Sequence, residues 1–227
     1  MIPYQNPTIY LGNLRIDEPI TVLTDLIVVC VCVFAFFKTS SATSTKSVNL
    51  YRWFLLVTGL STLVSAIIGH AFLYAFSFNA KIFGWITGIT SVIFAQFAAI
   101  LHTKSLFKPS TVNLLMIINA LEIILAFFLL FYFNSFVVVE IHSAIGLILT
   151  VSILEYAYYQ QSKSVLSKHM LLGIGVAVLA IVCHITKLAI SVWFNHMDLS
   201  HIIIAIAIYV MYLGIKKELK INTLSHS

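Results

Sequence analysis

Seven long apolar runs fill most of the chain and leave only short polar connections between them. A hydrocarbon core of roughly 30 Å needs a helix of about 20 residues, so each run is long enough to cross a bilayer. A transmembrane barrel would show alternating segments of about ten residues, whereas residues 123–130 are continuously apolar. We therefore predict an all-α, polytopic membrane protein with one bundle of seven transmembrane helices at residues 20–215. The predicted spans are 20–38, 51–76, 82–103, 110–133, 136–159, 168–193 and 199–215.

The composition agrees with this fold class. Of the 227 residues, 60% are hydrophobic and 9% are charged, whereas about a quarter of the residues of a soluble domain are charged. Residues 1–19 lack a basic region followed by an apolar stretch and a cleavage site, so we expect an uncleaved N-terminal tail. Residues 216–227 are expected to form a polar C-terminal tail. The three cysteines, which all fall inside predicted spans, are expected to pack as small apolar side chains.

Basic residues in the connections predict the orientation, because cytoplasmic loops carry an excess of Lys and Arg. Ten of them fall on one side of the predicted bundle, and only Arg15 and Lys81 fall on the other. This places the N-terminus outside the cytoplasm and the C-terminus inside, and we expect the plasma (inner) membrane. It also accounts for the net charge of +5 without a nucleic-acid partner. The ten residues are Lys38, Lys46, Arg52, Lys104, Lys108, Lys163, Lys168, Lys216, Lys217 and Lys220.

Ionisable residues in and beside the spans gather toward the extracytoplasmic side. With a rise of about 1.5 Å per residue, His70, His184 and Lys187 lie roughly 24–28 Å from the basic residue at the cytoplasmic end of their span. Charged groups in spans normally face the bundle interior or a wet cavity, so we expect a shared polar cavity that opens outward. Its candidate residues are Asp25, His70, Glu140, His142, His184, Lys187, His196, Asp198 and His201.

Several polar residues also have plain structural interpretations. Asp198 either caps the seventh helix or orients His201 as a supporting carboxylate. Lys187 is expected to pair with Asp25 or Glu140, because a buried charge needs a partner. Interhelical hydrogen bonds are expected from Gln96, Asn113, Asn119 and Glu155, a structural role from Glu122, and solvent contact from His102, His169 and His226.

Three of the histidines have the number and depth that a zinc site requires. A catalytic zinc ion takes three protein ligands and keeps one position for water, whose pKa falls to about 7. His70, His196 and His201 are the predicted ligands, with His142 and His184 in reserve. A metal-bound hydroxide at this depth would be placed to hydrolyse the amide or ester of a lipid that enters from the bilayer.

A histidine late in the second span and a histidine pair at the start of the seventh make the chain resemble the CREST superfamily. That superfamily includes alkaline ceramidases, adiponectin and progestin receptors, and lipid-remodelling proteins of GPI-anchor maturation. The resemblance implies zinc held by His70, His196 and His201, in a lipid hydrolase or an inactive relative. The acidic opening at residues 17–19 is similar to the N-terminal region of the ceramidases.

The chain departs from the family pattern at three points. Four residues separate His196 from His201 instead of three, the family serine position falls on Ala66 next to Ser65, and the third span has no aspartate. We accordingly assign Asp25, Ser65 and Lys187 as the expected catalytic residues beside the metal.

Two other classes of function are compatible with these residues. Paired histidines on neighbouring helices also bind haem, so an electron-transfer protein could use two of His70, His142, His184 and His201. A non-catalytic receptor or sensor would bind a small molecule in the same cavity. Membrane lipids are the expected partners in every case.

Overall fold

Seven helical stretches in the part of the chain that the structure describes, residues 7–40 and 44–225, are long and apolar enough to cross a membrane. The structure is a computed structural model. The seven stretches are Pro19–Lys38, Lys46–Ala71, Phe78–His102, Pro109–Phe133, Phe136–Ser162, Val165–Ile185 and His196–Ile221. This confirms the predominantly helical class and the prediction of seven helices suited to crossing a membrane, which suggests an integral, multi-pass membrane protein.

Two of the stretches contain a π-helix. The second consists of α2 (Lys46–Val64) and the π-helix η1 (Ser65–Ala71), and the fifth of α5 (Phe136–Ser143), the π-helix η5 (Ala144–Val151) and α6 (Ser152–Ser162). π-Helical turns are rare in proteins, and those that occur often lie at functional sites. The remaining long helices are α1 (Pro19–Lys38), α3 (Ile82–His102), α4 (Pro109–Phe133), α7 (Val165–Ile185) and α8 (His196–Ser225); short 3-10 turns lie at Leu73–Ala75, Phe78–Lys81 and Lys104–Leu106.

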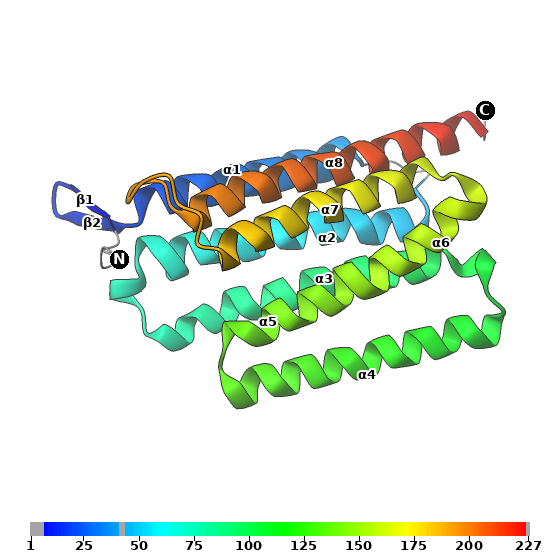
Figure 1. The fold of residues 1–227 in the computed structure, drawn as a ribbon, viewed down its shortest axis with the longest axis horizontal. Helices are drawn as coiled ribbons and strands as arrows, with labels where there is room; N and C mark the ends of the chain where they lie inside the picture. The colour runs from blue at the N-terminus through cyan, green and yellow to red at the C-terminus, as the bar shows by residue number, and fades with distance from the viewer. Residues whose placement is uncertain (1–6, 41–43, 226–227) are drawn as a thin grey trace.

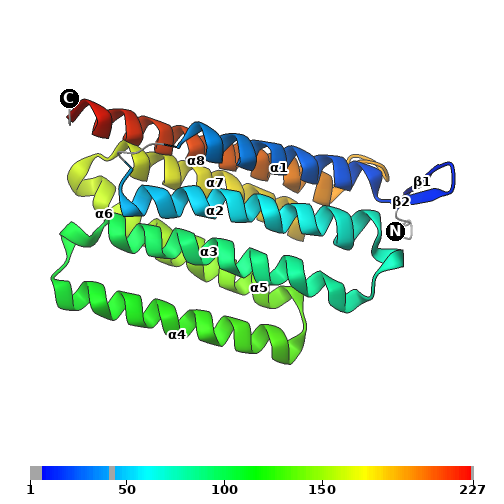
Figure 2. The same ribbon diagram turned by 180° about the vertical axis from the view of Figure 1, so that it is seen from behind.

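The helices run lengthwise, with a β-hairpin at one end of the bundle and the end of α8 at the other (Figure 1). We call these the hairpin end and the opposite end. Helices α1, α2, α7 and α8 pack together, α3 packs on α2, and α4 lies at the far edge against α3 and α5 (Figure 2). The main core joins α1, α2, α3, α6, α7 and α8, and a smaller one joins α3, α4 and α5.

Small residues let two helix pairs approach closely. A Cβ atom added at Gly59 of α2 would lie 2.7 Å from Cβ of Cys32 on α1. One added at Gly173 of α7 would lie 2.4 Å from Cγ of Met211 on α8. Such contacts are typical of membrane bundles, in which close packing of backbones contributes to helix association. Cys32 is buried at this contact and free, as the sequence predicted, while Cys30 is exposed.

The sixth helix ends earlier than predicted, at Ile185 instead of residue 193. The chain leaves the helix through Lys187, which has the left-handed φ of 51°. The loop that follows is closed by a hydrogen bond from Phe194 N to Ser191 Oγ, 3.0 Å long. His184, Lys187 and Ser191 therefore do not form one helical face, because only the first of them lies on α7.

The seventh helix begins earlier and continues further than predicted. It starts at His196 and runs to Ser225, so most of the expected tail at 216–227 is helical. Its start is a reciprocal cap: Met197 N donates to Asn195 Oδ1 at 2.8 Å, and Asn195 N donates to Asp198 Oδ2 at 2.6 Å. This is the geometry of a capping box. Asp198 therefore serves the cap from the third helical position and is not the N-cap residue itself.

The predicted N-terminal tail contains an antiparallel hairpin of β1 (Thr8–Leu11) and β2 (Leu14–Asp17). A two-residue Gly-Asn turn connects the strands, and Gly12 adopts the left-handed φ of 63° that such turns require. The hairpin docks on the segment after η1, where Tyr74 Oη donates to the carbonyl of Arg15 at 2.9 Å. The chain then enters α1 through Pro19 at its first turn, where the missing N–H of proline costs least.

Candidate functional site

Helices α1 and α8 and the π-helix η1 bring a group of polar side chains together at the hairpin end. The group consists of Glu18, Thr24, Asp25, His70 and His201, and we call it the hairpin-end cluster. The π-helical turn carries His70 and α8 carries His201 one turn after its start, while the other three residues lie at the beginning of α1. The prediction that these ionisable residues share one end of the bundle is therefore confirmed for Asp25, His70 and His201.

Glu18 holds one side of the His70 ring. His70 Nδ1 lies 2.5 Å from Glu18 Oε2, which is a short hydrogen bond. Glu18 has the left-handed φ of 48° at the position before α1, and this conformation accompanies the turn from the hairpin into the helix. A carboxylate that accepts from Nδ1 leaves Nε2 of the neutral imidazole as a lone-pair acceptor.

Asp25 lies between the two imidazoles of the cluster. Its Oδ1 atom is 3.1 Å from His201 Nδ1, and its Oδ2 atom is 3.9 Å from His70 Nε2. The carboxylate is buried, and Oδ2 has no hydrogen-bond partner. Thr24 Oγ1 lies 3.2 Å from His201 Nδ1 and donates to the carbonyl of Thr21. Two acceptor atoms, His70 Nε2 and Asp25 Oδ2, thus face each other across a gap.

His196 belongs to a different pair. Its ring centroid lies 5.2 Å from that of His184, at the junction of α7 and α8. The ring centroids of His70 and His201 are 6.3 Å apart. Within residues 7–40 and 44–225, no three His, Cys, Asp or Glu side chains are arranged as a ready metal site. Of the predicted ligands, the structure thus brings His70 and His201 to one carboxylate.

Asp198 supports the fold next to the cluster. Thr21 Oγ1 donates to Asp198 Oδ1 at 2.7 Å, and this bond joins the start of α1 to the start of α8. The other carboxylate oxygen accepts from the backbone of Asn195 in the helix cap. The sequence left two roles open for Asp198, a helix cap or a carboxylate that orients His201. The structure shows contacts for the capping role.

Within the described residues, no hydrogen bond or ion pair joins the cluster to the remaining catalytic candidates Ser65 and Lys187 or to Glu140. Lys187 and Glu140 are exposed, and none of the ion pairs in the described part of the chain involves either of them. The expected pairing of Lys187 with Asp25 or Glu140 is therefore wrong, because the loop after α7 points the lysine outward. Ser65 lies on η1, and its Oγ atom would be 3.2 Å from a Cβ atom added at Gly69.

A mostly apolar cavity of about 340 Å³ lies one turn below His201, between α2, α3, α5, α7 and α8. Ile204 of α8 is one of its lining residues. Helices α2, α3 and α5 contribute hydroxyl groups to the lining of the cavity, whereas the lining residues of α7 and α8 are all apolar. Its polar lining consists of Thr58, Ser61, Thr62, Ser91 and Ser143.

A second polar network lies toward the opposite end, around the fully buried Glu155. Tyr51 Oη and Ser167 Oγ each donate to this carboxylate at 2.5 Å, and His102 Nδ1 lies 2.9 Å from Oε2. The expected interhelical hydrogen bonding of Glu155 is confirmed. The expected solvation of His102 is wrong, because its ring is enclosed by the carboxylate and by Tyr158 at a centroid distance of 4.7 Å.

Two further histidines expected at the surface have different outcomes. His169 Nδ1 lies 2.7 Å from the carbonyl of Val165, and its Nε2 lies 3.1 Å from Nζ of Lys217. It is therefore half-buried and bonded. His226 lies outside the described residues.

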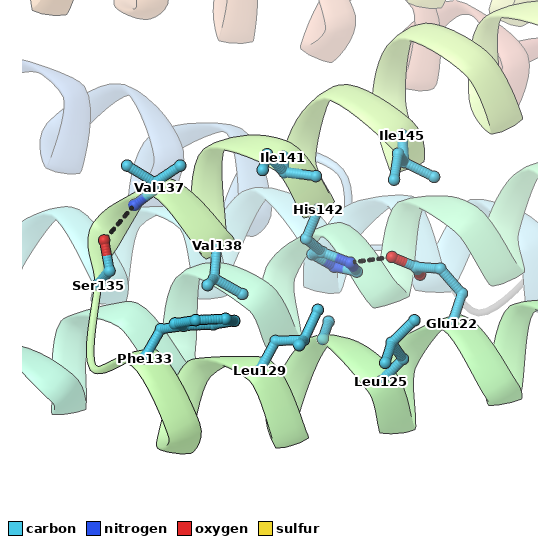
Figure 3. A pocket seen from close by; sticks show the side chains of 11 residues that line it. Glu122, Leu125, Leu129, Phe133, Ser135, Val137, Val138, Ile141, His142 and Ile145 are labelled. Carbon is cyan, nitrogen blue, oxygen red and sulfur yellow. Dashed lines mark hydrogen bonds and ion pairs between the residues drawn. The ribbon is translucent and has the colours of Figure 1, made fainter.

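His142, predicted as a reserve metal ligand or haem ligand, pairs instead with Glu122 of α4. Its Nδ1 atom is 2.7 Å from Glu122 Oε1 (Figure 3). The expected interhelical role of Gln96 is confirmed, since its amide donates to Glu122 at 3.3 Å. This pair lies on α4 and α5, on the side of the bundle away from α1 and α8 (Figure 2).

Four partners in these networks were not predicted from the sequence. Glu18 appeared only as part of the acidic opening at residues 17–19, and Thr24, Tyr51 and Ser167 were not singled out. Nothing in the sequence marks Tyr51, which is one of ten tyrosines. Thr24 does carry a signal, because it adjoins Asp25 within a span that is otherwise poor in polar residues.

No curated protein matches the chain. The match to a family model covers residues 20–220, which includes every residue of the hairpin-end cluster except Glu18. The chain therefore belongs to the family described as a family of unknown function (DUF6962).

Proposed function

We propose that this protein hydrolyses the amide or ester bond of a membrane lipid at a zinc site formed by His70, Asp25 and His201. The observation that carries the proposal is the pair of acceptors, His70 Nε2 and the buried Asp25 Oδ2, that face each other at 3.9 Å. A buried acceptor without a hydrogen-bond donor, such as Asp25 Oδ2, is costly. A cation between them removes that cost; zinc bonds of about 2.0–2.1 Å at a tetrahedral angle would bring the two atoms to about 3.3 Å, so the site closes slightly when the ion binds.

The three proposed ligand side chains are of types that bind zinc. Two imidazoles and one carboxylate form a known set of catalytic zinc ligands. His70 and His201 both reach Asp25, although their ring centroids are 6.3 Å apart. We infer that the rings turn toward the carboxylate when they share an ion. His196 takes no part in this revised set, because it pairs with His184.

The chain's own groups orient the proposed ligands. Glu18 accepts from His70 Nδ1 and so directs Nε2 into the site, as supporting carboxylates do in metal centres. Thr24 and Asp25 hold the His201 ring from the α1 side. Zinc at such a site supplies a Lewis acid and a hydroxide at neutral pH. Asp25, assigned a catalytic role from the sequence, becomes a ligand in this proposal, and Ser65 and Lys187 have no role in it.

The apolar cavity next to His201 supports a lipid as the substrate. Its walls on α7 and α8 are apolar, and its volume of about 340 Å³ lies within the usual range of small-molecule pockets. An acyl chain in this cavity would place the bond at its head close to the hairpin-end cluster. The hydroxyl groups that α2 and α3 contribute donate to backbone carbonyls, so they can only accept hydrogen bonds from an occupant.

The distribution of basic residues supports an extracytoplasmic location for this site. Lys and Arg are concentrated in the connections at the opposite end, which is the pattern of cytoplasmic loops. We therefore propose that the hairpin end faces outward from the plasma (inner) membrane. The substrate would then come from the outer leaflet.

The test is hydrolysis of two synthetic probes, a fluorogenic long-chain N-acyl amide and the matching ester, by the protein in lipid nanodiscs. Turnover of either probe that is lost with a zinc chelator and restored by zinc is the expected result. Asp25→Asn should lower the rate at least about tenfold, and the matched variant His196→Gln should stay within about threefold of wild type.

Three outcomes contradict the proposal. Loss of turnover in His196→Gln but not in Asp25→Asn would favour the three-histidine set. Zinc binding without turnover of either probe would contradict hydrolysis and favour a receptor or sensor. A Soret band in the purified protein would favour haem in place of zinc.

A further inference from the structure

A second pocket, of about 480 Å³, lies between α4 and α5 on the opposite side of the bundle from α1 and α8. It begins at Phe133 and Ser135, at the hairpin end, and extends along α4 to Glu122. The eleven residue steps from Glu122 to Phe133 correspond to roughly 16 Å of helix, so the pocket reaches about the middle of α4. Leu125, Leu129, Val138 and Ile141 are among its apolar lining residues (Figure 3).

The inner end of this pocket is polar. Glu122 and His142 both line it, and their side chains are hydrogen-bonded to each other (Figure 3). The Glu122 side chain retains 20% of its exposure, whereas that of His142 retains 1%. A partly accessible carboxyl group near the middle of a membrane-spanning helix is costly, and such groups in spans are usually functional.

The pair carries no net charge. His142 Nδ1 faces Glu122 Oε1 at 2.7 Å, and His142 Nε2 faces the carbonyl of Ile89 at 3.3 Å. The carbonyl can only accept, so Nε2 carries a proton. A second proton lies between Nδ1 and the carboxyl oxygen, on either atom. In both cases the two side chains together are neutral, which agrees with their place in an apolar environment.

The pair still has capacity to accept a hydrogen bond. Gln96 Nε2 donates to Glu122 Oε2 at 3.3 Å, and each carboxyl oxygen has a second lone pair. The partly exposed side of Glu122 faces the pocket, where the lining is otherwise apolar apart from Ser135 and His142. An occupant therefore gains most if its polar group donates a hydrogen bond to Glu122.

We propose that this pocket binds an uncharged, membrane-dissolved alcohol, with its hydroxyl group on Glu122 and its apolar body along α4 and α5. An ammonium group would bring a net charge into the site, which is unfavourable in a membrane. An ether or a ketone offers no donor. The site shares no residue with the hairpin-end cluster, so it stands independently of the hydrolase proposal.

The experiment is photo-crosslinking of the full chain in lipid nanodiscs with two diazirine-bearing alcohols, a sterol and a 1,2-diacylglycerol. Each is compared with its own O-methyl ether, which keeps the apolar body and removes the donor. We expect one of the alcohols to label peptides from residues 122–145 at least about fivefold more than its ether, a ratio that corresponds to one hydrogen bond of about 1 kcal/mol. The alcohol that labels these peptides more strongly than its ether identifies the class of lipid that the pocket binds.

Two variants and one control make the result specific. Leu129→Trp fills the pocket and leaves the polar pair intact, and Glu122→Leu removes the acceptor; both should reduce alcohol labelling to the level of the ether. Leu121→Trp places the same ring on an exposed position of α4 outside the pocket lining and should have no effect. Equal labelling by alcohols and ethers, or unchanged labelling of Leu129→Trp, would overturn the proposal.

Discussion

His70 Nε2 and Asp25 Oδ2 face each other across 3.9 Å at the hairpin end of the bundle, and Oδ2 has no hydrogen-bond donor. The residues lie on different helices, and Glu18 holds the far side of the imidazole. This arrangement distinguishes the hairpin-end cluster from the Glu155 network, in which hydroxyl groups donate to both carboxylate oxygens. It makes the first cluster a candidate site for a cation and the second a structural network.

Glu18→Gln should weaken zinc binding while leaving the three proposed ligands in place. An amide replaces the carboxylate on His70 Nδ1, and loss of such a supporting group typically lowers metal affinity about 10- to 100-fold. The measurement is a competition titration of zinc against a chelating dye. Asp17→Asn is the control, because the neighbouring carboxylate interacts with Arg15 and Thr8 of the hairpin. Equal affinities of Glu18→Gln and wild type would show that Glu18 does not support the site.

Tyr51→Phe should destabilise the protein without affecting zinc binding. It removes one of the two hydroxyl donors to the buried Glu155. Side-chain hydrogen bonds in membrane proteins contribute about 0.6–1.7 kcal/mol, which corresponds to a fall in Tm of roughly 2–5 °C for a chain of this length. Thermal unfolding in detergent measures the effect. Tyr156→Phe, at an exposed position of α6, should leave Tm unchanged, and an equal fall in both variants would contradict the structural role of the network.

Asp17 should make the hairpin sensitive to acid. Burial raises the pKa of this carboxyl, but hydrogen bonds from Arg15 and Thr8 and the charge of Arg15 outweigh burial and hold the pKa below its usual range. Its stabilising contribution is therefore complete above the unfolded pKa, about 3.9, and is lost as the pH falls through the lower folded value. The Arg15 Nε–H signal in NMR spectra should shift with a midpoint below 3.9 and stay constant in Asp17→Asn. A midpoint at or above 3.9 would contradict the assigned hydrogen bonds.

The spans could be predicted from the sequence because the physical signal is strong and local. About 20 apolar residues have few alternatives to a helix in a membrane. The first and last residues of the spans were less predictable from the sequence. Residues 188–193, which are apolar except for Ser191, look like a continuation of α7. The chain nevertheless turns at Lys187, and the cap that starts α8 depends on the Asn195 side chain. The hairpin had a signal in Gly12-Asn13 that lies between two short strands.

The residues of the candidate site could be predicted only in part. Depth along each helix placed His70, Asp25 and His201 at one end of the bundle, and depth depends only on residue number. Rotation about the helix axis depends on packing, and it decided that His196 pairs with His184 and that His142 pairs with Glu122. The π-helical turn at Ser65–Ala71 also shifts the face on which His70 lies, and a regular helical period does not predict such a turn.

The zinc content of purified protein tests the central claim most directly. After incubation with zinc and removal of excess metal, elemental analysis should find about one zinc ion per chain in the wild type and in His196→Gln. Asp25→Asn and His70→Ala should each lose it while retaining the elution profile of the folded protein. Absence of zinc from the wild type, or equal zinc in Asp25→Asn and wild type, would contradict a metal site at His70, Asp25 and His201.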